Sequence, residues 1–593
     1  MKKYTILSVF LLFIAFILRF WFVWEIPFHY DELSAIFRAR FPNWQAHWQL
    51  GIFGDGHPPG VQTLLWLWVQ HIGESPAPLH ILAALCGMLS CFFLYMASDY
   101  WLQKQGKLIF LILCSTSFLF ICWSQQIRPY TFGMAAVSLG IWFWSRMLHA
   151  PVARKKDWMV FGIACTLSAY IHHFAALTCA GLWLSGMLWN PTGKKEWGKA
   201  AVLSAILYLP GLSALYQQLK TGGLQWLGKP TISFIPDHVY LLLNKQSGIV
   251  TLLVLICILG FPSVVSNKKI KTLFVFLALF LLPLVTGYLW SVLHTPVLQH
   301  TVLLFSAPFL YLSIAYIFDH IKRIETLNLY FSGYVFLFMV YGLYQSRHYT
   351  LGYKDGYAEQ IKKMQVQDQR IGMYLCQVYD GPADIFQHHA GKYAFNGQVH
   401  LMGPDTAPFQ PQRLWKIWRK SDGNISAAVN SGSHPLLIPL LEHWSGHTPI
   451  TRISWIGTEY LQFSSEKGTP CVYSNLTTHS TGMSKISAEY LLTQPNAVIV
   501  FHIPDTTLPD NTELICATVK KGKIIDWRSS KKSDWRNTGD GTVFLAVKTA
   551  DIPGINARCT FEIGVKINDR LHRQKVEIRS SAGNPYLYGA IWP

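Results

Sequence analysis

Long stretches without a charged side chain recur along this chain, and they constrain its fold more than any other feature. A helix of about 20 residues crosses roughly 30 Å of hydrocarbon. Only 14% of the residues are charged, whereas about a quarter is usual in a soluble protein. We therefore predict a polytopic α-helical membrane protein. Five stretches predict single spans, interrupted by no charge except Arg19: residues 4–24, 78–97, 108–125, 129–145 and 200–219.

Four further stretches bring the predicted number of spans to eleven. Residues 158–189 and 272–318 are each long enough for two spans, and residues 248–267 and 327–346 supply one span each. The first span is not predicted to be a cleaved signal peptide, because its apolar stretch is too long and lacks a small-residue cleavage site.

The basic residues of the short loops predict the orientation. They all fall on one side if eleven spans are drawn, and such loops stay in the cytoplasm. We expect the amino terminus inside and everything after residue 346 outside, in the inner membrane of a bacterium. Residues 58–72 then remain outside, as an amphipathic helix at the outer interface. The net charge of +18 is thereby explained without nucleic acid as a partner.

The composition changes after residue 346, which predicts a water-exposed appendage on a membrane module of residues 1–345. Residues 346–470 are predicted to form a small α/β domain, and the short strand-like runs of residues 471–593 predict a β-sandwich. The appendage holds four of the eleven cysteines. Two disulfides are possible there, with four reduced thiols as the alternative: Cys516 with Cys559, and Cys376 with Cys471.

Ionisable residues stand at the outer ends of the spans in four places, and they are the candidate functional residues. The first place is the pair Asp31 and Glu32, shortly after the first span. Adjacent carboxylates can supply a general base for a hydroxyl nucleophile, or ligands for a divalent cation. The alternative is an acidic cap on a helix that begins after Pro27.

The second place is the Gly- and Pro-rich segment 54–60. Glycines on both sides of Asp55 let the backbone approach a ligand closely, and Pro58 and Pro59 fix the direction of the following helix. A plain turn needs only the Gly and Pro residues, so Asp55 and His57 are the informative ones.

The third and fourth places lie at later outer turns. Arg128 precedes Pro129, which starts a helix, so a guanidinium and a positive helix end coincide and predict a phosphate site. The alternative is an arginine that reaches toward lipid headgroups. The pair His172 and His173 can ligate a metal, donate to a phosphate or move a proton, or can be a tolerated polar turn.

Together and in this order, the four motifs resemble the GT-C glycosyltransferase superfamily, in particular the branch of the protein O-mannosyltransferases and the lipid A aminoarabinose transferase. In that family an acidic pair follows the first span, and His-Pro-Pro or Lys-Pro-Pro, Arg-Pro-Tyr-like and Tyr-x-His elements come after it. The matching residues within 1–345 are Asp31-Glu32, His57-Pro58-Pro59, Arg128-Pro129-Tyr130, and Tyr170 with His172-His173.

The resemblance implies an enzyme that moves a sugar from a polyprenyl-phosphate donor to an acceptor hydroxyl on the outer face, with inversion. Asp31, with Glu32 beside it, would be catalytic, and Asp31 would take the acceptor's proton. The acceptor can be a cell-envelope glycan, a lipid or a protein. A divalent metal is optional in this superfamily, and its candidate ligands here are Asp31, Asp55, His57 and His173.

Two departures from the family pattern affect the expected binding residues. Gln299-His300-Thr301 stands where an Arg-Tyr pair often opens a late span, and His80 stands where an Arg is common. Lysines of the outer loop 220–247 are the available replacements. The expected substrate-binding residues are Asp55, His57, Arg128, Tyr130, His172, His173, Lys220, Lys229, Lys245 and His300.

Two other functions fit parts of the sequence. A transporter or flippase of lipid-linked sugars would use the same outer site without chemistry, and charges deep within the spans would favour it. The spans contain only Arg19. A non-catalytic scaffold needs one or two spans as an anchor, so eleven spans argue against it.

Overall fold

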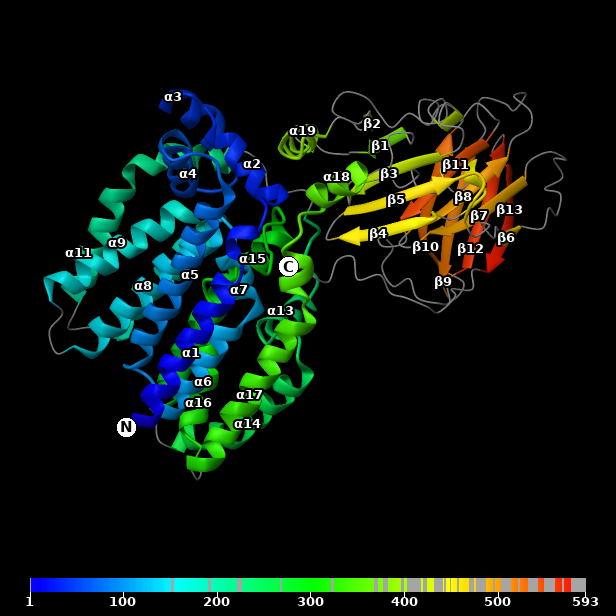
Figure 1. Cartoon of the computed structure of the whole chain (residues 1–593). Coiled ribbons are helices and arrows are strands. Elements are labelled where there is room, and N and C mark those ends of the chain that lie inside the picture. Colours follow the sequence, from blue (N-terminus) through cyan, green and yellow to red (C-terminus); the bar gives the residue numbers. More distant parts are fainter. Residues whose placement is uncertain are drawn as a thin grey trace. The chain divides into compact units, whose positions relative to one another are not determined.

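The computed structural model describes residues 2–366 apart from 151–153, 190–193, 221–226, 267–268 and 322–324, and beyond them the elements named below with a few adjoining residues. The chain forms two compact units, Met1–Tyr353 and Lys354–Trp592 (Figure 1). The first unit is helical and extends past residue 345, where the membrane module was predicted to end.

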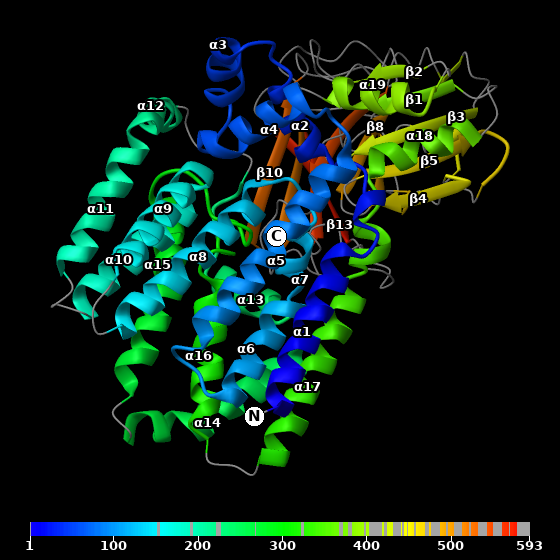
Figure 2. The same ribbon diagram turned by 60° about the vertical axis from the view of Figure 1, so that its left-hand side comes forward.

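Helices occupy every stretch that was predicted to contain spans, and they run side by side in the first unit (Figure 2). They are α1 (Lys2–Phe20), α5 (Pro76–Ser98), α6 (Lys104–Thr116) with α7 (Phe118–Ser124), α8 (Pro129–His149), α9 (Lys155–Ile171), α10 (His173–Trp189), α11 (Lys194–Tyr208) with η4 (Leu209–Gly211) and α12 (Leu212–Lys220), α14 (Ser247–Ser266), α15 (Ile270–Leu293), α16 (Ala307–Asp319) and α17 (Glu325–Gln345).

Shorter helical elements connect these helices: η1 (Val23–Glu25), α2 (Tyr30–Ala39), α3 (Trp44–Ala46), η2 (His47–Ile52), α4 (Pro59–His71), α13 (Phe234–Leu242) and η5 (His348–Gly352). Among the described residues, six helices are long and apolar enough to cross a membrane, or seven if the bent pair α6 and α7 is one span. The protein is thus a multi-pass membrane protein, and the number of eleven spans stays a prediction.

The core of the helical unit lies around four helices. Helices α6, α7, α8 and α16 are buried on nearly all sides. In contrast, α1 and α14 expose large apolar side chains such as Phe13 and Ile258. A helix that shows apolar side chains outward is suited to contact with lipid, because water would not solvate that face.

Helix α4 is the predicted interfacial helix, and it packs between α2 and α9. Pro59 occupies its first turn, where a missing N–H costs nothing. Gly60 allows the close approach to α9, because a Cβ there would lie 2.6 Å from the main-chain oxygen of Tyr170. The Gly- and Pro-rich segment therefore carries Asp55 and His57 against the C-terminal end of α9. The depth of α4 in a membrane stays a prediction.

A bend of 50° separates α6 from α7 at Ser117. The side chain of Asn244 fills this break: its Oδ1 accepts the N–H of Phe118 at 2.7 Å, and its Nδ2 donates to the oxygens of Thr116 and Met339 at 2.8 Å each. Asn244 holds a left-handed backbone conformation, with φ of 54°. One side chain thus satisfies the main-chain groups that the bend releases.

The end of the helical unit is attached to the end of α1 and to the segment that follows α7. The Nε2 of His348 in η5 lies 2.6 Å from Oε1 of Gln125, and the hydroxyl of Tyr349 donates to the oxygen of Leu18 at 2.5 Å. The amide of Gln125 also donates to the oxygen of Arg19. Element η5 is therefore bonded to the segment that leads into Arg128.

The second unit begins with mixed α/β structure. Strands β1 and β2 are parallel, as are β1 and β3, whereas β5 is antiparallel to β3 and β4 in the five-stranded order β2-β1-β3-β5-β4. The assignment of residues 346–470 to a separate α/β domain stays a prediction. The elements are α18 (Gly356–Val366), β1 (Gly372–Cys376), α19 (Pro382–Lys392), β2 (Val399–Met402), β3 (Asn424–Asn430), β4 (Thr451–Trp455) and β5 (Thr458–Ser464).

Two four-stranded antiparallel sheets follow, in the orders β10-β9-β12-β13 and β11-β8-β7-β6. Their packing as a sandwich stays a prediction. Of the predicted disulfide cysteines, Cys471 and Cys559 lie outside the described residues, as do the side chains of Cys376 and Cys516. The strands are β6 (Ser474–Asn475), β7 (Ser487–Thr493), β8 (Asn496–His502), β9 (Glu513–Lys520), β10 (Lys523–Lys531), β11 (Thr542–Lys548), β12 (Thr560–Ile567) and β13 (Arg570–Glu577).

Candidate active site

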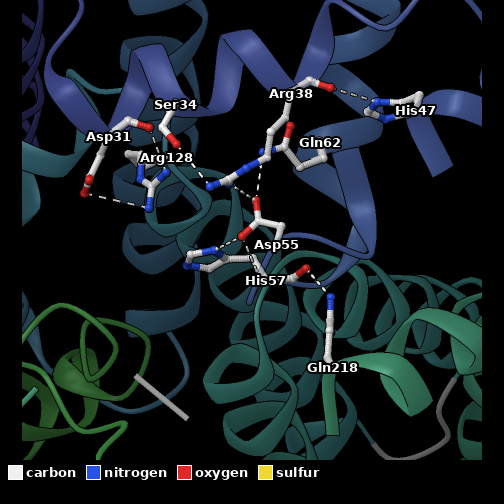
Figure 3. Close-up of polar contacts among 9 residues, drawn as sticks. All are labelled: Asp31, Ser34, Arg38, His47, Asp55, His57, Gln62, Arg128 and Gln218. Carbon is white, nitrogen blue, oxygen red and sulfur yellow. Dashed lines mark hydrogen bonds and ion pairs between the residues drawn. The ribbon is translucent and has the colours of Figure 1, made fainter. Parts of the chain in front are cut away.

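Asp31 and Arg128, about a hundred positions apart in sequence, lie side by side at the start of α2 and of α8 (Figure 3). Nη2 of Arg128 is 3.8 Å from Oδ2 of Asp31, and its Nη1 donates to the main-chain oxygen of Asp31 at 3.1 Å. The Asp31 side chain is 63% exposed, whereas that of Arg128 is 11% exposed. The guanidinium is thus held in place while the carboxylate remains accessible.

Glu32 has a different environment from its neighbour. It is fully buried in the first turn of α2, where Oε2 accepts the N–H of His29 at 3.0 Å. Its Oε1 lies 2.9 Å from Nε2 of His80 and accepts the N–H of Ile127 at 2.7 Å. We predicted Glu32 as a catalytic residue. Its burial and its contacts instead favour the alternative of an acidic helix cap.

Asp55 lies at the centre of a second polar group (Figure 3). Its Oδ2 accepts from Nη1 of Arg38 at 2.9 Å and from Gln62 at 2.8 Å, and its Oδ1 lies 2.8 Å from Nδ1 of His57. Only 6% of the Asp55 side chain is exposed. Because a carboxylate can only accept, Nδ1 of His57 donates a hydrogen bond to Asp55. Nε2 of the same ring takes no part in this bond and can face a substrate.

The histidine pair joins this group from the turn between α9 and α10. The ring of His172 lies 5.6 Å from the ring of His57 and 5.7 Å from that of Tyr130, measured between centroids. Nδ1 of His172 accepts the N–H of Phe174 at 3.1 Å. His173 forms a side-chain hydrogen bond with Gln218 of α12, whose amide also donates to the main-chain oxygen of His57.

The burial of the site shifts its ionisation. Burial would raise the pKa of Asp55, but the bond to His57 and the charges of His57, Arg38 and Arg128 lower it below its ordinary value. The pKa of Glu32 is also lowered, because His80 and His29 outweigh the effect of burial. Burial lowers the pKa of His172 strongly, aided by the charges of neighbouring cations. His172 is therefore neutral at pH 7, with its proton on Nε2, since Nδ1 is an acceptor.

Of the predicted binding lysines, Lys220 ends α12, and Lys229 and Lys245 lie on either side of α13. Nζ of Lys229 donates to the oxygen of Val292 at 3.0 Å, and Lys220 lies over the ring of Tyr216 at 4.0 Å. Neither contact links its lysine to the group around Asp55. Lys245 is exposed and holds a left-handed backbone conformation, with φ of 57°.

His300 stacks on the ring of Phe234 and lies beside that of His238. Its ring lies 4.2 Å from that of Phe234 and 5.4 Å from that of His238, and Nδ1 of each histidine is 3.3 Å from the other. Burial lowers the pKa of His300 to about 4. The adjacent Thr301 reaches the site through a side-chain hydrogen bond with Tyr130.

The candidate metal ligands are not gathered into one set. Among the residues that the structure describes, no three His, Cys, Asp or Glu side chains lie close enough together to hold a metal ion. Asp55 and His57 bond to each other, and Asp31 pairs with Arg128. The candidate ligands Asp31, Asp55, His57 and His173 are therefore not gathered around one point in this arrangement.

The sequence-based prediction missed Arg38, Gln62 and Ser34. Arg38 bridges Asp55 and the hydroxyl of Ser34, to which its Nη2 donates at 3.0 Å. Residues 31, 34 and 38 recur at the spacing of one helical face. That spacing was the available signal, but it has meaning only if the segment is known to be helical.

Part of the chain matches a known family. The family model described as dolichyl-phosphate-mannose-protein mannosyltransferase matches residues 56–216. The match includes His57, Arg128 and His172, and it begins after Asp31 and Asp55. No curated protein matches this chain in sequence.

Solved structures with a similar course of the chain include two of ArnT from Cupriavidus metallidurans. The apo structure is 12% identical with a TM-score of 0.40, and the match covers 79% of this chain and 99% of that one. The form bound to undecaprenyl phosphate is 11% identical with a TM-score of 0.39, covering 78% and 97%. The oligosaccharyltransferase of Archaeoglobus fulgidus, in complex with Zn and sulfate, is 10% identical with a TM-score of 0.35, covering 97% and 98%.

Proposed function

We propose, from the premise that this chain is a relative of the GT-C glycosyltransferases through residues 56–216, that it moves a sugar from a polyprenyl-phosphate donor to an acceptor hydroxyl at the outer face of the membrane, with inversion. The observation that carries the proposal is the contact of the exposed Asp31 carboxylate with the held guanidinium of Arg128. A carboxylate that can act as a base and a guanidinium that can bind a phosphate are neighbours there.

Asp31 acts as the general base in this proposal. Its carboxylate is the accessible one, because Glu32 is fully buried and Asp55 is occupied by Arg38, His57 and Gln62. The acceptor hydroxyl loses its proton to Asp31 as its oxygen bonds to the anomeric carbon. Attack from the face opposite the phosphate gives inversion.

Arg128 stabilises the leaving group. As the bond between the anomeric carbon and the phosphate oxygen breaks, its electron pair goes to the polyprenyl phosphate, whose negative charge increases. Arg128 is nearly buried and already fixed by the main-chain oxygen of Asp31, so little reorganisation is needed at that moment. His57 and neutral His172 supply hydrogen-bonding positions for the sugar or the phosphate.

Arg19 gives the transporter hypothesis no support. It is the one charge within the predicted spans, and it is buried. Its Nη1 donates to the oxygens of Ala15 and Ser115, and its Nη2 donates to that of Cys114. The guanidinium thus joins α1 to α6 and is not directed into a path for a substrate.

Replacing Asp31 by Asn tests the proposal. Transfer from a polyprenyl-phosphate-linked sugar by purified protein should fall by roughly 10²- to 10⁴-fold, because the amide cannot take the proton. Glu25→Gln is the matched control, since Glu25 is another exposed carboxylate shortly after α1, and it should leave transfer unchanged. Wild-type turnover in Asp31→Asn would show that the base is another group. Mass analysis of the acceptors identifies the product.

A further inference from the structure

The buried carboxylate of Glu32 joins three separate parts of the helical unit. It accepts the N–H of His29 before α2, lies 2.9 Å from Nε2 of His80 on α5, and accepts the N–H of Ile127 before α8. Both Glu32 and His80 have no exposed surface. A buried carboxylate that satisfies three donors on three elements restricts how those elements can move relative to one another.

Two of these contacts are adjacent in sequence to the proposed reacting groups. Glu32 follows Asp31, and Ile127 precedes Arg128. The bond from Nη1 of Arg128 to the main-chain oxygen of Asp31, 3.1 Å long, closes a ring of contacts around the same place. The buried Glu32 carboxylate, which no substrate can reach, therefore fixes the distance between the Asp31 carboxylate and the Arg128 guanidinium.

We propose that Glu32 and His80 form a positioning pair, which sets the general base Asp31 against the phosphate ligand Arg128. This inference rests on the proposed function. In this role Glu32 positions Asp31 and does not itself react. His80 donates to Glu32 from the position where the family often has an Arg. The imidazole donates from Nε2, and its other nitrogen has no hydrogen-bond partner among the described residues. One donor from residue 80 is therefore enough.

Variants at residue 80 test this role. His80→Leu removes the donor, whereas His80→Gln keeps an amide N–H that can reach the same carboxylate oxygen. For His80→Leu and for Glu32→Gln we expect kcat to fall by roughly 10- to 100-fold, since displacement of a reacting group by about 1 Å has effects of this size. His80→Gln should recover most of the lost turnover. The KM for the donor should rise in the impaired variants, because Arg128 moves with Ile127.

Asp157 provides a matched control for Glu32. It also occupies the third position of a helix, is 1% exposed, accepts the N–H of Arg154 at 3.2 Å and lies 2.9 Å from Nε of Arg146. Arg146 and Arg128 stand at opposite ends of α8, so Asp157→Asn disturbs a buried carboxylate and its 29% exposed arginine partner away from the site. It should lower the thermal midpoint in detergent about as much as Glu32→Gln, with kcat and KM near the wild-type values.

The results separate the positioning role from a general loss of structure. The proposal is overturned if Glu32→Gln and Asp157→Asn have the same kcat and KM, or if His80→Gln is as impaired as His80→Leu. If the wild-type protein transfers no sugar, the proposed function is rejected, but the positioning role is not yet tested. The affinity for undecaprenyl phosphate then measures the position of Arg128, and an unchanged affinity in His80→Leu rejects the positioning role as well.

Discussion

At the scale of single residues, each guanidinium of the site lies beside a carboxylate, but the two pairs differ in exposure. Arg128 is 3.8 Å from Asp31, which is 63% exposed, and Arg38 is 2.9 Å from Asp55, which is 6% exposed. An incoming hydroxyl can reach Asp31, whereas Asp55 is surrounded by its donors. Asp55 is therefore expected to contribute to stability, and Asp31 to the reaction.

The pH dependence of stability tests the role of Asp55. Its pKa in the folded protein is below the ordinary value of 3.8, so its stabilising contribution is present above that pH and is lost as the pH falls. Asp55→Asn places a buried N–H against other donors, which should cost about 1–3 kcal/mol at neutral pH. Thermal midpoints of the two proteins in detergent should stay apart down to about pH 4 and converge as the pH falls further toward the lowered pKa of Asp55. A difference that grows in acid would contradict this assignment.

The acidic pair was predictable in part from the sequence. The general base and the helix cap were alternatives for the pair as a whole, and the structure assigns the cap to Glu32 while it leaves Asp31 exposed. Sequence spacing cannot separate two adjacent residues in this way, because the direction of each side chain depends on the helix they start. The partner His80 lies 48 positions away from Glu32 on α5, and only the tertiary fold brings the two side chains together.

At the scale of elements, the helix positions were predictable because uncharged stretches leave few alternatives, but the break between α6 and α7 was not. Residues 108–125 contain no Pro or Gly to mark it. The signal was the run Ser115, Thr116 and Ser117, since small hydroxyl residues compete with the backbone for hydrogen bonds. The bend also needs the distant Asn244, whose contribution no local pattern shows.

Substitutions at Asn244 test how the bend is held. Asn244→Ala removes the bonds to Thr116, Phe118 and Met339, and each buried group left without a partner should cost about 1–3 kcal/mol. Asn244→Gly loses the same bonds but adopts the left-handed conformation without strain, so it should be more stable than Asn244→Ala by about 1 kcal/mol. The order of the two thermal midpoints is the measurement. Equal or reversed midpoints would mean that the left-handed turn does not persist.

At the scale of the whole molecule, the predicted resemblance to the GT-C glycosyltransferases is confirmed over residues 56–216. Four short motifs in the family's order predicted it. Their order along the chain reflects the order of helices and loops, which composition alone does not. The end of the helical unit at Tyr353 was not predictable from the composition change at residue 346. Polar segment η5 belongs to the helical unit through contacts such as that of His348 with Gln125.

Reporter fusions test the predicted topology. Alkaline phosphatase, which is active only outside the cytoplasm, is fused after Lys156, Lys229, Lys271 or Ser346. Eleven spans with the amino terminus inside predict activity after Lys229 and Ser346 only, because basic loops stay in the cytoplasm. If only the seven most apolar spans cross, the results at the first three positions reverse. If only six cross, the fusion after Ser346 is inactive.

The attachment of η5 has a mechanical consequence. The chain leaves the helical unit from a point that is bonded to Gln125, three residues before Arg128. Because Gln125 is in turn bonded to the end of α1, the point at which η5 is attached is itself held in place. Tension applied to the chain after η5 would be transmitted to the backbone segment just before Arg128.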